Sequence, residues 1–260
     1  MGVDCWNLYL SSIAFDFDGH GGVDGSARRI RGNFMPPSKK PDILISWSGG
    51  KDCALALYDL LQDGAYQPVS LLTTLTEDYD RISMHGIRRS LLLQQADSLG
   101  LPLIEVLIPK DATNEIYAAK MEAVSLEQKK AGVDAVMFGD IFLEDVRDYR
   151  VQNLSRVGME AVFPLWGVDT AALAHRFIEL GFKAALAVVD SQVLDGKFAD
   201  RDYDEKLLDD LPAGIDPCGE NGEFHTFVHD GPLFHFPISF TKGEVVLRDN
   251  RFYFCDFIEK

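Results

Sequence analysis

The residues best suited to chemistry form one short segment, Ser48-Gly49-Gly50-Lys51-Asp52-Cys53. It follows an apolar run at residues 43–47 and precedes a helical pattern at residues 54–61. Two consecutive glycines permit a tight turn whose N–H groups point at an anion, and the helix adds the positive end of its dipole. Because Lys51 adds a full positive charge, the segment predicts a polyphosphate site.

The spacing within this segment excludes the commoner phosphate loops. A Walker loop needs a glycine where Ile45 stands, and the segment contains no GxGxxG pattern. Ser48 and Lys51 satisfy the S-x-x-K pattern of penicillin-binding enzymes, but no Ser-Asp-Asn or Lys-Thr-Gly follows to complete that site. A glycine turn without a ligand would leave Lys51 and Asp52 at a buried junction without charged partners, which is costly.

A second segment, from Asp216 to Phe234, concentrates acidic residues and glycines before an apolar strand. Glu220 and Glu223 stand three residues apart around Asn221 and Gly222. Two such carboxylates can be presented to a cation, either an ammonium group or Mg²⁺. A solvated turn is the alternative interpretation of this segment.

The elements that must position these segments alternate between strands and helices. Short runs rich in Val, Ile and Leu predict strands buried on both faces, at residues 43–47, 69–75, 103–108 and 135–138. Helical patterns at 82–99 and 114–131 each end at a glycine, Gly100 or Gly132. This alternation predicts an α/β fold with a doubly wound parallel sheet and right-handed crossovers.

The ligand of such a sheet binds beyond the carboxyl ends of its strands. We therefore expect residues from several strand ends to converge on it, namely Ser48, Thr73, Thr74, Gly139 and Asp140.

After Asp140 the pattern loosens and predicts a second, smaller α+β domain. Strands are expected at 161–166 and 184–189, a helix at 170–180, and a hairpin formed by 244–247 and 252–257 around Asp249-Asn250. The predicted domains are a weakly ordered extension at 1–40, an ATP-binding domain at 41–142 and an acceptor-binding domain at 143–260.

Composition narrows the function classes. The chain has 260 residues, with 41 acidic and 25 basic side chains and a net charge of −16, which argues against nucleic acid as a partner. No apolar run approaches the ~20 residues of a membrane span, so no membrane association is expected. Cys5, Cys53, Cys218 and Cys255 contain no C-x-x-C pair and are expected to be reduced thiols of a cytoplasmic protein.

The first segment resembles the pyrophosphate loop of N-type ATP pyrophosphatases, SGGxD[ST], with Cys53 in place of the usual hydroxyl residue. Both segments together resemble the diphthine-ammonia ligase (diphthamide synthase) family of these proteins, from about Asp42 to Phe236. The motifs that carry the resemblance are Ser48 to Cys53, His85 in Met-His-Gly, Gly139-Asp140, Tyr149 to Asn153, Pro164 to Trp166, and Cys218 to Thr226. The family's last motif is closer to C-G-E-G-G-E-[YF]-E-T, so Asn221 replaces a glycine and His225 a glutamate.

The resemblance implies an adenine nucleotide alpha hydrolase-like (HUP-type) fold and ATP with Mg²⁺ as cofactors. Family members use ATP to activate the carboxyl of diphthine, a modified histidine of elongation factor 2, and ammonia then displaces AMP to form the amide. The implied partners are therefore ATP, ammonia and an unidentified carboxylate acceptor, either diphthine on the elongation factor or a small molecule. A homodimer is left open as the assembly state.

The resemblance also implies roles for individual residues. Ser48, Gly49, Gly50, Lys51 and Cys53 hold the pyrophosphate, and Asp52 positions the metal or the helix start. Thr73, Thr74, Gly139 and Asp140 lie near the adenosine and the α-phosphate. Arg150 and Asn153 neutralise the adenylate, while His85 and Arg88 either face the nucleotide or form a pair on the surface. Lys51, Asp52, Glu220 and Glu223 act in catalysis, the two glutamates by orienting the acceptor or deprotonating ammonium. Gly219, Asn221, Gly222, His225 and Thr226 contact the acceptor.

Two other functions remain open at this point. A sulfur transferase would use the same adenylation, with Cys53 and Cys218 carrying a persulfide. A regulatory module would bind the nucleotide without chemistry, and the second acidic segment argues against it.

Overall fold

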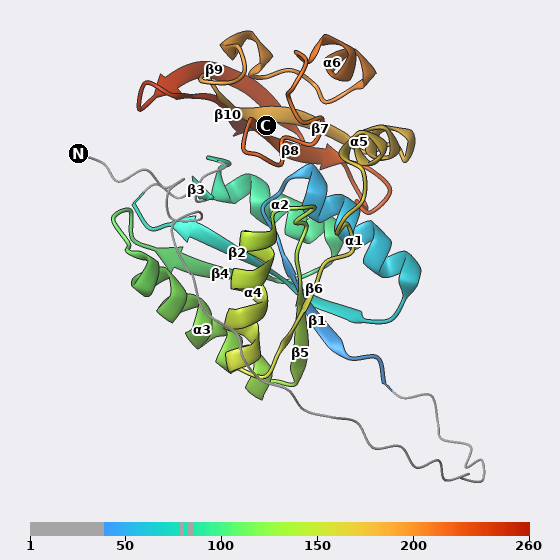
Figure 1. Cartoon of the computed structure of the whole chain (residues 1–260), viewed down its shortest axis with the longest axis vertical. Helices are drawn as coiled ribbons and strands as arrows, with labels where there is room; N and C mark the ends of the chain where they lie inside the picture. Colours follow the sequence, from blue (N-terminus) through green and yellow to red (C-terminus); the bar gives the residue numbers. More distant parts are fainter. Residues whose placement is uncertain (1–38, 79–80, 83–85) are drawn as a thin grey trace, which may run out of the picture.

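Two β-sheets form the frame of the part of the chain that the structure describes (Figure 1). The structure is a computed structural model that describes residues 39–78, 81–82 and 86–260. The predicted extension at 1–40 lies outside these residues except for Lys39 and Lys40.

Sheet A consists of parallel strands in the spatial order β4-β2-β1-β5-β6. In chain order they are β1 (Asp42–Ser46), β2 (Gln67–Thr76), β4 (Leu103–Ile108), β5 (Val133–Met137) and β6 (Glu160–Val162). A short strand, β3 (Arg81–Ile82), pairs antiparallel with the end of β2. The chain runs outward from β1 to β2 on one side and returns to β5 on the other. The carboxyl ends of β1 and β5 therefore form the point where a doubly wound sheet binds its ligand.

Helices cover both faces of sheet A. The helices α1 (Lys51–Asp63) and α2 (Arg89–Leu99) lie on one face, and α3 (Asn114–Lys130) and α4 (Glu144–Arg156) on the other (Figure 1). Alternate residues of β1 show the two faces: Ile43 and Ile45 belong to the core shared with α1 and α2, whereas Leu44 belongs to the second core. The prediction of a doubly wound parallel α/β sheet is confirmed.

Sheet B is antiparallel, in the order β8-β7-β10-β9. Its strands are β7 (Lys183–Asp190), β8 (Phe224–Asp230), β9 (Phe240–Arg248) and β10 (Phe252–Glu259), accompanied by α5 (Thr170–Glu179), α6 (Glu205–Asp210) and a 3₁₀ turn at Gly196–Phe198. The predicted hairpin is confirmed as β9 and β10. Its turn residues Asp249 and Asn250 both have positive φ, 51° and 53°, as a tight hairpin turn requires.

Two predicted elements differ from the structure. The helix expected from residue 82 begins at Arg89, because Ile82 is part of β3 and Gly86 turns the chain with a φ of 66°. A Cβ at Gly86 would lie 2.8 Å from the Phe254 ring of β10, so the turn before α2 packs closely against the second layer.

The strand expected at 161–166 is the shorter β6, and it pairs with β5 in sheet A instead of joining the second sheet. Both α4 and β6 follow residue 142 yet pack on sheet A. The boundary between residues 142 and 143 stays a prediction.

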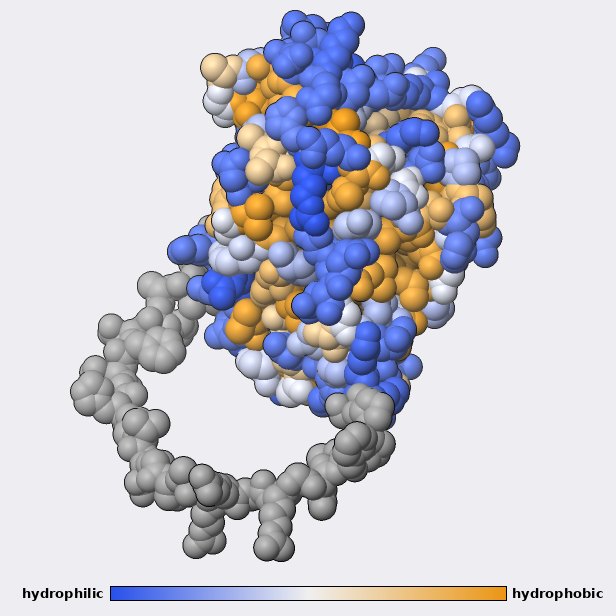
Figure 2. Space-filling model, turned by 90° about the vertical axis from the view of Figure 1, so that its right-hand side faces the viewer, coloured by the Kyte–Doolittle hydropathy of each residue, from blue (hydrophilic) through white to orange (hydrophobic). Residues whose placement is uncertain are grey.

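The layers of sheet A and sheet B share one apolar core. It contains Leu57 of α1 and Leu92 of α2 together with Phe177 of α5 and Phe227 and Phe257 of sheet B. On the face shown in Figure 2, hydrophilic residues extend from one end of the molecule to the other, with hydrophobic patches between them. Within the described ranges, no helix is long and apolar enough to cross a membrane.

Candidate active site

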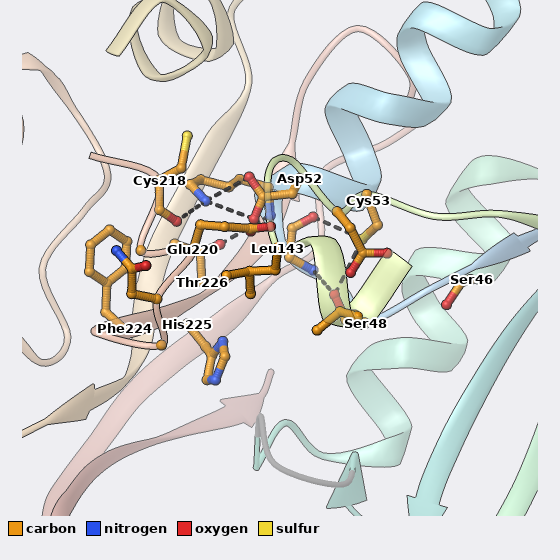
Figure 3. A pocket seen from close by; sticks show the side chains of 18 of the residues that line it. Ser46, Ser48, Asp52, Cys53, Leu143, Cys218, Glu220, Phe224, His225 and Thr226 are labelled. Carbon is orange, nitrogen blue, oxygen red and sulfur yellow. Dashed lines mark hydrogen bonds and ion pairs between the residues drawn. The ribbon is translucent and has the colours of Figure 1, made fainter. Parts of the chain in front are cut away.

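A cavity of about 400 Å³ lies where the two layers meet, at the carboxyl ends of β1 and β5. Figure 3 shows Ser48, Asp52 and Cys53 on one side of it, and Cys218, Glu220, His225 and Thr226 on the other. Its size falls in the range of small-molecule sites. The lining residues are Ser46, Ser48, Gly50, Lys51, Asp52, Cys53, Gly139, Asp140, Leu143, Val146, Arg150, Cys218, Gly219, Glu220, Asn221, Gly222, Phe224, His225 and Thr226.

The glycine loop turns from β1 into α1 at one side of this cavity. Gly49 has a φ of 76°, which a residue with a Cβ rarely adopts. Gly50 is the N-cap of α1 and provides no side-chain cap, so the first N–H groups of the helix point beyond its end. Ser48 Oγ accepts the N–H of Gly50 at 3.4 Å. The loop thus combines backbone donors with a helix N-terminus, as an anion site requires.

Lys51 is buried at the centre of the site, with 3% of its surface exposed. Its Nζ donates to both carboxylate oxygens of Asp52, at 2.7 and 2.8 Å, and to the carbonyl of Cys218. It also lies over the rings of Tyr203 and Phe224, 5.8 and 5.9 Å from their centroids. Burial is the largest effect and opposes its charge, but the attraction of Asp52, together with smaller contributions from Cys218 and Tyr203, raises the pKa of Lys51 above its ordinary value. Lys51 is therefore a fixed positive charge.

Carboxyl groups from both sides of the cavity lie close enough to influence one another's protonation. Burial, reinforced by the charges of Asp52 and Asp140, raises the pKa of Glu220 to about 8, although Glu220 Oε1 accepts the N–H of Ile141 at 2.8 Å. Burial likewise raises the pKa of Asp52, against the opposing effect of Lys51. The site can therefore accept a cation or hold a proton near neutral pH.

Arg150 neutralises one of these carboxylates. Its guanidinium contacts Asp140 at 2.6 and 3.0 Å and lies over the Phe138 ring at 4.3 Å. The pair connects α4 to the segment that follows β5.

The second layer contacts the glycine loop directly. Thr226 Oγ of β8 accepts the N–H of Lys51 at 3.0 Å, and the N–H of Val228 donates to the carbonyl of Gly49 at 2.9 Å. On the other side, a Cβ at Gly139 would lie 2.9 Å from the backbone of Asp52 and Cys53, so only glycine allows the segment after β5 to approach α1 this closely. The loop is held between the two layers.

Both cysteines of the site are buried thiols. Burial raises the pKa of Cys53, whose Sγ donates to the carbonyl of Gly50 at 3.0 Å. Burial raises the pKa of Cys218 to about 12, and its Sγ donates to the carbonyl of Thr170 at 3.3 Å. A reactive cysteine needs a lowered pKa and access to solvent, so neither has the environment of a persulfide carrier.

Most of the predicted site residues meet at this cavity, but several do not. Its lining omits Gly49, whose carbonyl points to β8, and Asn153, which lies on α4 beyond Arg150. It also omits Thr73 and Thr74, which pair with Glu105 and Val106 of β4. His85 lies outside the described residues.

Glu223 is also absent from the lining. Its Oε1 accepts the N–H of Asp216 and the side-chain amide of Asn221, both at 3.1 Å. These contacts brace the loop from Asp216 to Glu223. Arg88 forms a bidentate pair with Asp256 of β10 at 2.6 and 2.9 Å and does not line the cavity.

Sequence reasoning missed Ser46, Leu143, Val146 and Phe224 in the lining, and Gln95 of α2 beneath the glycine loop. The helical pattern marked Gln95 only as a polar residue within an apolar stretch, which was the one available signal.

A glycine loop with a buried lysine, placed at the switch point of a doubly wound sheet, defines a polyphosphate-binding α/β protein. The family model of the diphthamide synthase N-terminal domain matches residues 42–161, and that of the diphthamide synthase C-terminal domain matches residues 169–257. The chain belongs to the diphthamide synthase family.

Curated relatives carry the name diphthine–ammonia ligase. The one from Schizosaccharomyces pombe is 28% identical over 222 residues, covering 76% of this chain but only 36% of the relative. The human one is 25% identical over 223 residues, covering 77% of this chain and 83% of the relative. A crystal structure described as a predicted subunit of a tRNA methyltransferase from Methanocaldococcus jannaschii is 20% identical, covering 57% of this chain and 79% of that chain. Its TM-score of 0.36 supports no conclusion about fold or function.

Proposed function

We propose that this chain is an ATP-dependent amide-forming ligase. An acceptor carboxylate attacks the α-phosphorus of ATP, which gives an acyl adenylate and pyrophosphate. Ammonia then attacks the acyl carbon, AMP leaves, and the amide forms with release of one proton. The observation that carries the proposal is that a buried Lys51 on a helix N-terminal loop and a Glu220 carboxyl with a raised pKa line the same cavity. The names of the curated relatives support the same reaction.

In this proposal the glycine loop receives the pyrophosphate portion of ATP. The N–H groups at the start of α1 and the ammonium of Lys51 offset the negative charge that develops on the leaving pyrophosphate. The loop itself is already fixed, because Thr226 accepts the Lys51 N–H and the Gly49 carbonyl accepts the Val228 N–H, so the loop needs no rearrangement when the bond breaks.

Magnesium is proposed as the metal that accompanies the phosphates, and it would lower their repulsion. Asp52 and Asp140, both in the cavity lining, are the carboxylates that would hold it. Within the described ranges, no group of three or more His, Cys, Asp or Glu side chains is arranged to hold a metal ion. This fits Mg²⁺, which proteins usually bind through one or two carboxylates together with the phosphates.

Glu220 is proposed as the group that receives the proton of the ammonia nucleophile. Its pKa of about 8 lies close to neutral pH, where a general base is most effective. Asp52 and Asp140 add negative charge around it, which favours an ammonium ion in the same place.

The acceptor is proposed to be a diphthine-bearing substrate, as the names of the relatives suggest. Asn221, Gly222 and His225 of the second layer line the side of the cavity opposite the glycine loop, where an acceptor would enter. A cytoplasmic location is part of the proposal and is supported by the free, buried state of Cys53, Cys218 and Cys255.

The test is to follow AMP, ADP and pyrophosphate during incubation with ATP, Mg²⁺, ¹⁵N-ammonium and diphthine-bearing elongation factor 2. The proposal expects AMP, pyrophosphate and a ¹⁵N amide in equal amounts, only when acceptor and ammonium are both present. Release of ADP and phosphate would refute it. A sulfur transferase would instead need a persulfide donor, and a regulatory module would release neither product.

A further inference from the structure

Gln95 of α2 is a polar side chain with no exposed surface, and it lies beneath the glycine loop. It contacts Trp47, the residue after β1, Gly49 of the loop and Val228 of β8. A buried amide must satisfy its hydrogen bonds within the protein, because water cannot reach it to replace them. Gln95 therefore joins α2 to two segments that are distant from it in the sequence, residues 47–49 and β8.

The hydrogen bonds fix the orientation of the Gln95 amide. Its Oε1 accepts the indole N–H of Trp47 at 2.9 Å, and its Nε2 donates to the carbonyls of Gly49 and Val228 at 3.1 and 2.5 Å. A glutamine amide has two N–H donors and one oxygen acceptor. If the amide were reversed, its N–H groups would face the indole N–H of Trp47, and its oxygen would face the carbonyl oxygens of Gly49 and Val228. Neither arrangement forms a hydrogen bond, so only the observed orientation satisfies the amide.

The amide of Gln95 in turn orients the peptide between Gly49 and Gly50. The carbonyl of Gly49 is held by Gln95 and by the N–H of Val228 at 2.9 Å. Because a trans peptide is planar, its N–H points opposite to its carbonyl. The N–H of Gly50 is thereby directed to the other side, where Ser48 Oγ and Gly50 itself line the cavity. A Cβ at Gly49 would lie 2.9 Å from Gln95 Oε1, so the amide and the loop are in close contact.

We infer that Gln95 is a positioning residue for the pyrophosphate portion of ATP. It does not line the cavity, and it acts by fixing the direction of the Gly50 N–H. The inference rests on the proposed function, because it assumes that the loop binds pyrophosphate. Removal of the amide should weaken the binding of ligands that place an anion on the loop. The affinity for AMP, which lacks the β- and γ-phosphates, should not change.

The test compares Gln95→Met with Ser98→Ala on the same helix. Ser98 is also fully buried, and its Oγ donates to the carbonyl of Phe236 at 2.6 Å and accepts the N–H of Phe236 at 3.1 Å. It joins α2 to the second layer without touching the glycine loop. Isothermal titration of the full chain with magnesium pyrophosphate, and separately with AMP, gives the two affinities, and thermal unfolding gives the stability of each variant.

Gln95→Met should bind pyrophosphate about tenfold more weakly, the effect of roughly 1.4 kcal/mol from lost hydrogen bonds, with the Kd for AMP unchanged within about twofold. Ser98→Ala should keep both affinities even where its melting temperature falls. Equal pyrophosphate affinity in Gln95→Met and wild type would overturn the inference, and so would a parallel loss of both ligands in both variants. If wild type binds neither ligand, the proposed function fails and the inference fails with it.

A second variant covers the case in which Gln95→Met does not fold. Trp47→Phe removes the N–H that Gln95 Oε1 accepts, together with part of the buried indole ring, so the amide is free to reverse and thermal unfolding is measured beside the titration. It should weaken the binding of pyrophosphate about threefold and leave the affinity for AMP unchanged. An unchanged pyrophosphate affinity in this variant would also overturn the inference.

Discussion

Replacing Glu220 by glutamine should change how the stability of the protein depends on pH. The folded protein raises the pKa of Glu220 from 4.5 to about 8, mainly through burial and then through the charges of Asp52 and Asp140. Between these pH values the native state binds a proton that the unfolded chain has lost. The free energy of unfolding therefore falls as pH rises, by roughly 1.4 kcal/mol per pH unit at most.

Summed from pH 4.5 to 8, this effect reaches about 5 kcal/mol as an upper limit. We expect about half of that, because Glu220 is only half-buried beside a water-accessible cavity, where charges are screened. Glutamine keeps the oxygen that accepts the Ile141 N–H but cannot ionise. Glu220→Gln should thus equal wild type in stability near pH 5 and exceed it by about 2–3 kcal/mol at pH 8.

Urea unfolding of wild type and Glu220→Gln at pH 5, 6, 7 and 8 measures this difference. All other titrating groups are common to both proteins, so the difference reports on Glu220 and the comparison at pH 5 is an internal control. Parallel stability curves over this range would refute the raised pKa, and with it the assignment of Glu220 as the proton acceptor.

Three further predictions concern the glycine loop and the acceptor side. Lys51→Ala should reduce ATP affinity at least tenfold in isothermal titration and abolish AMP formation. It removes the fixed positive charge of the site and leaves Asp52 unpaired. Retained AMP formation would contradict the role of Lys51. Gly49→Ala should lower the free energy of unfolding by about 1–3 kcal/mol in urea, because φ is 76° and the new Cβ meets Gln95; an unchanged stability would contradict this geometry. His225→Glu should raise turnover with diphthine-bearing elongation factor 2 and leave ATP affinity unchanged, since His225 lines the acceptor side of the cavity. A changed affinity for the nucleotide would place His225 in the ATP site instead.

The glycine loop could be predicted from the sequence because its determinants are local. Strand, glycines, lysine and helix follow one another within 43–61, and the structure turns from β1 into α1 at Gly49 and Gly50 as this order requires. The doubly wound sheet was predictable for the same reason, since short apolar runs between helical patterns indicate buried parallel strands.

The acidic segment that forms the other side of the site could be located in the sequence, but the geometry of its side chains could not be predicted. Glu220 and Glu223 have the same residue type and similar surroundings in the sequence, yet one carboxyl faces the cavity and the other braces the loop through Asp216 and Asn221. The turn conformation decides between them, and tertiary contacts fix that conformation. The contacts of Gln95 and Thr226 with the loop join residues 46 and 175 positions apart, and no local pattern reports on such pairs.

The central claim is that the acceptor carboxylate is activated by transfer of AMP, and an isotope measurement tests it most directly. The acceptor is prepared with ¹⁸O in its carboxylate and incubated with the enzyme, ATP, Mg²⁺ and ammonium, and the nucleotide products are analysed by mass spectrometry. Attack of the carboxylate on the α-phosphorus, followed by displacement by ammonia, leaves one carboxylate oxygen on AMP. We predict one ¹⁸O atom in AMP for each amide formed, whereas ¹⁸O in inorganic phosphate together with ADP, or unlabelled AMP, would contradict the account.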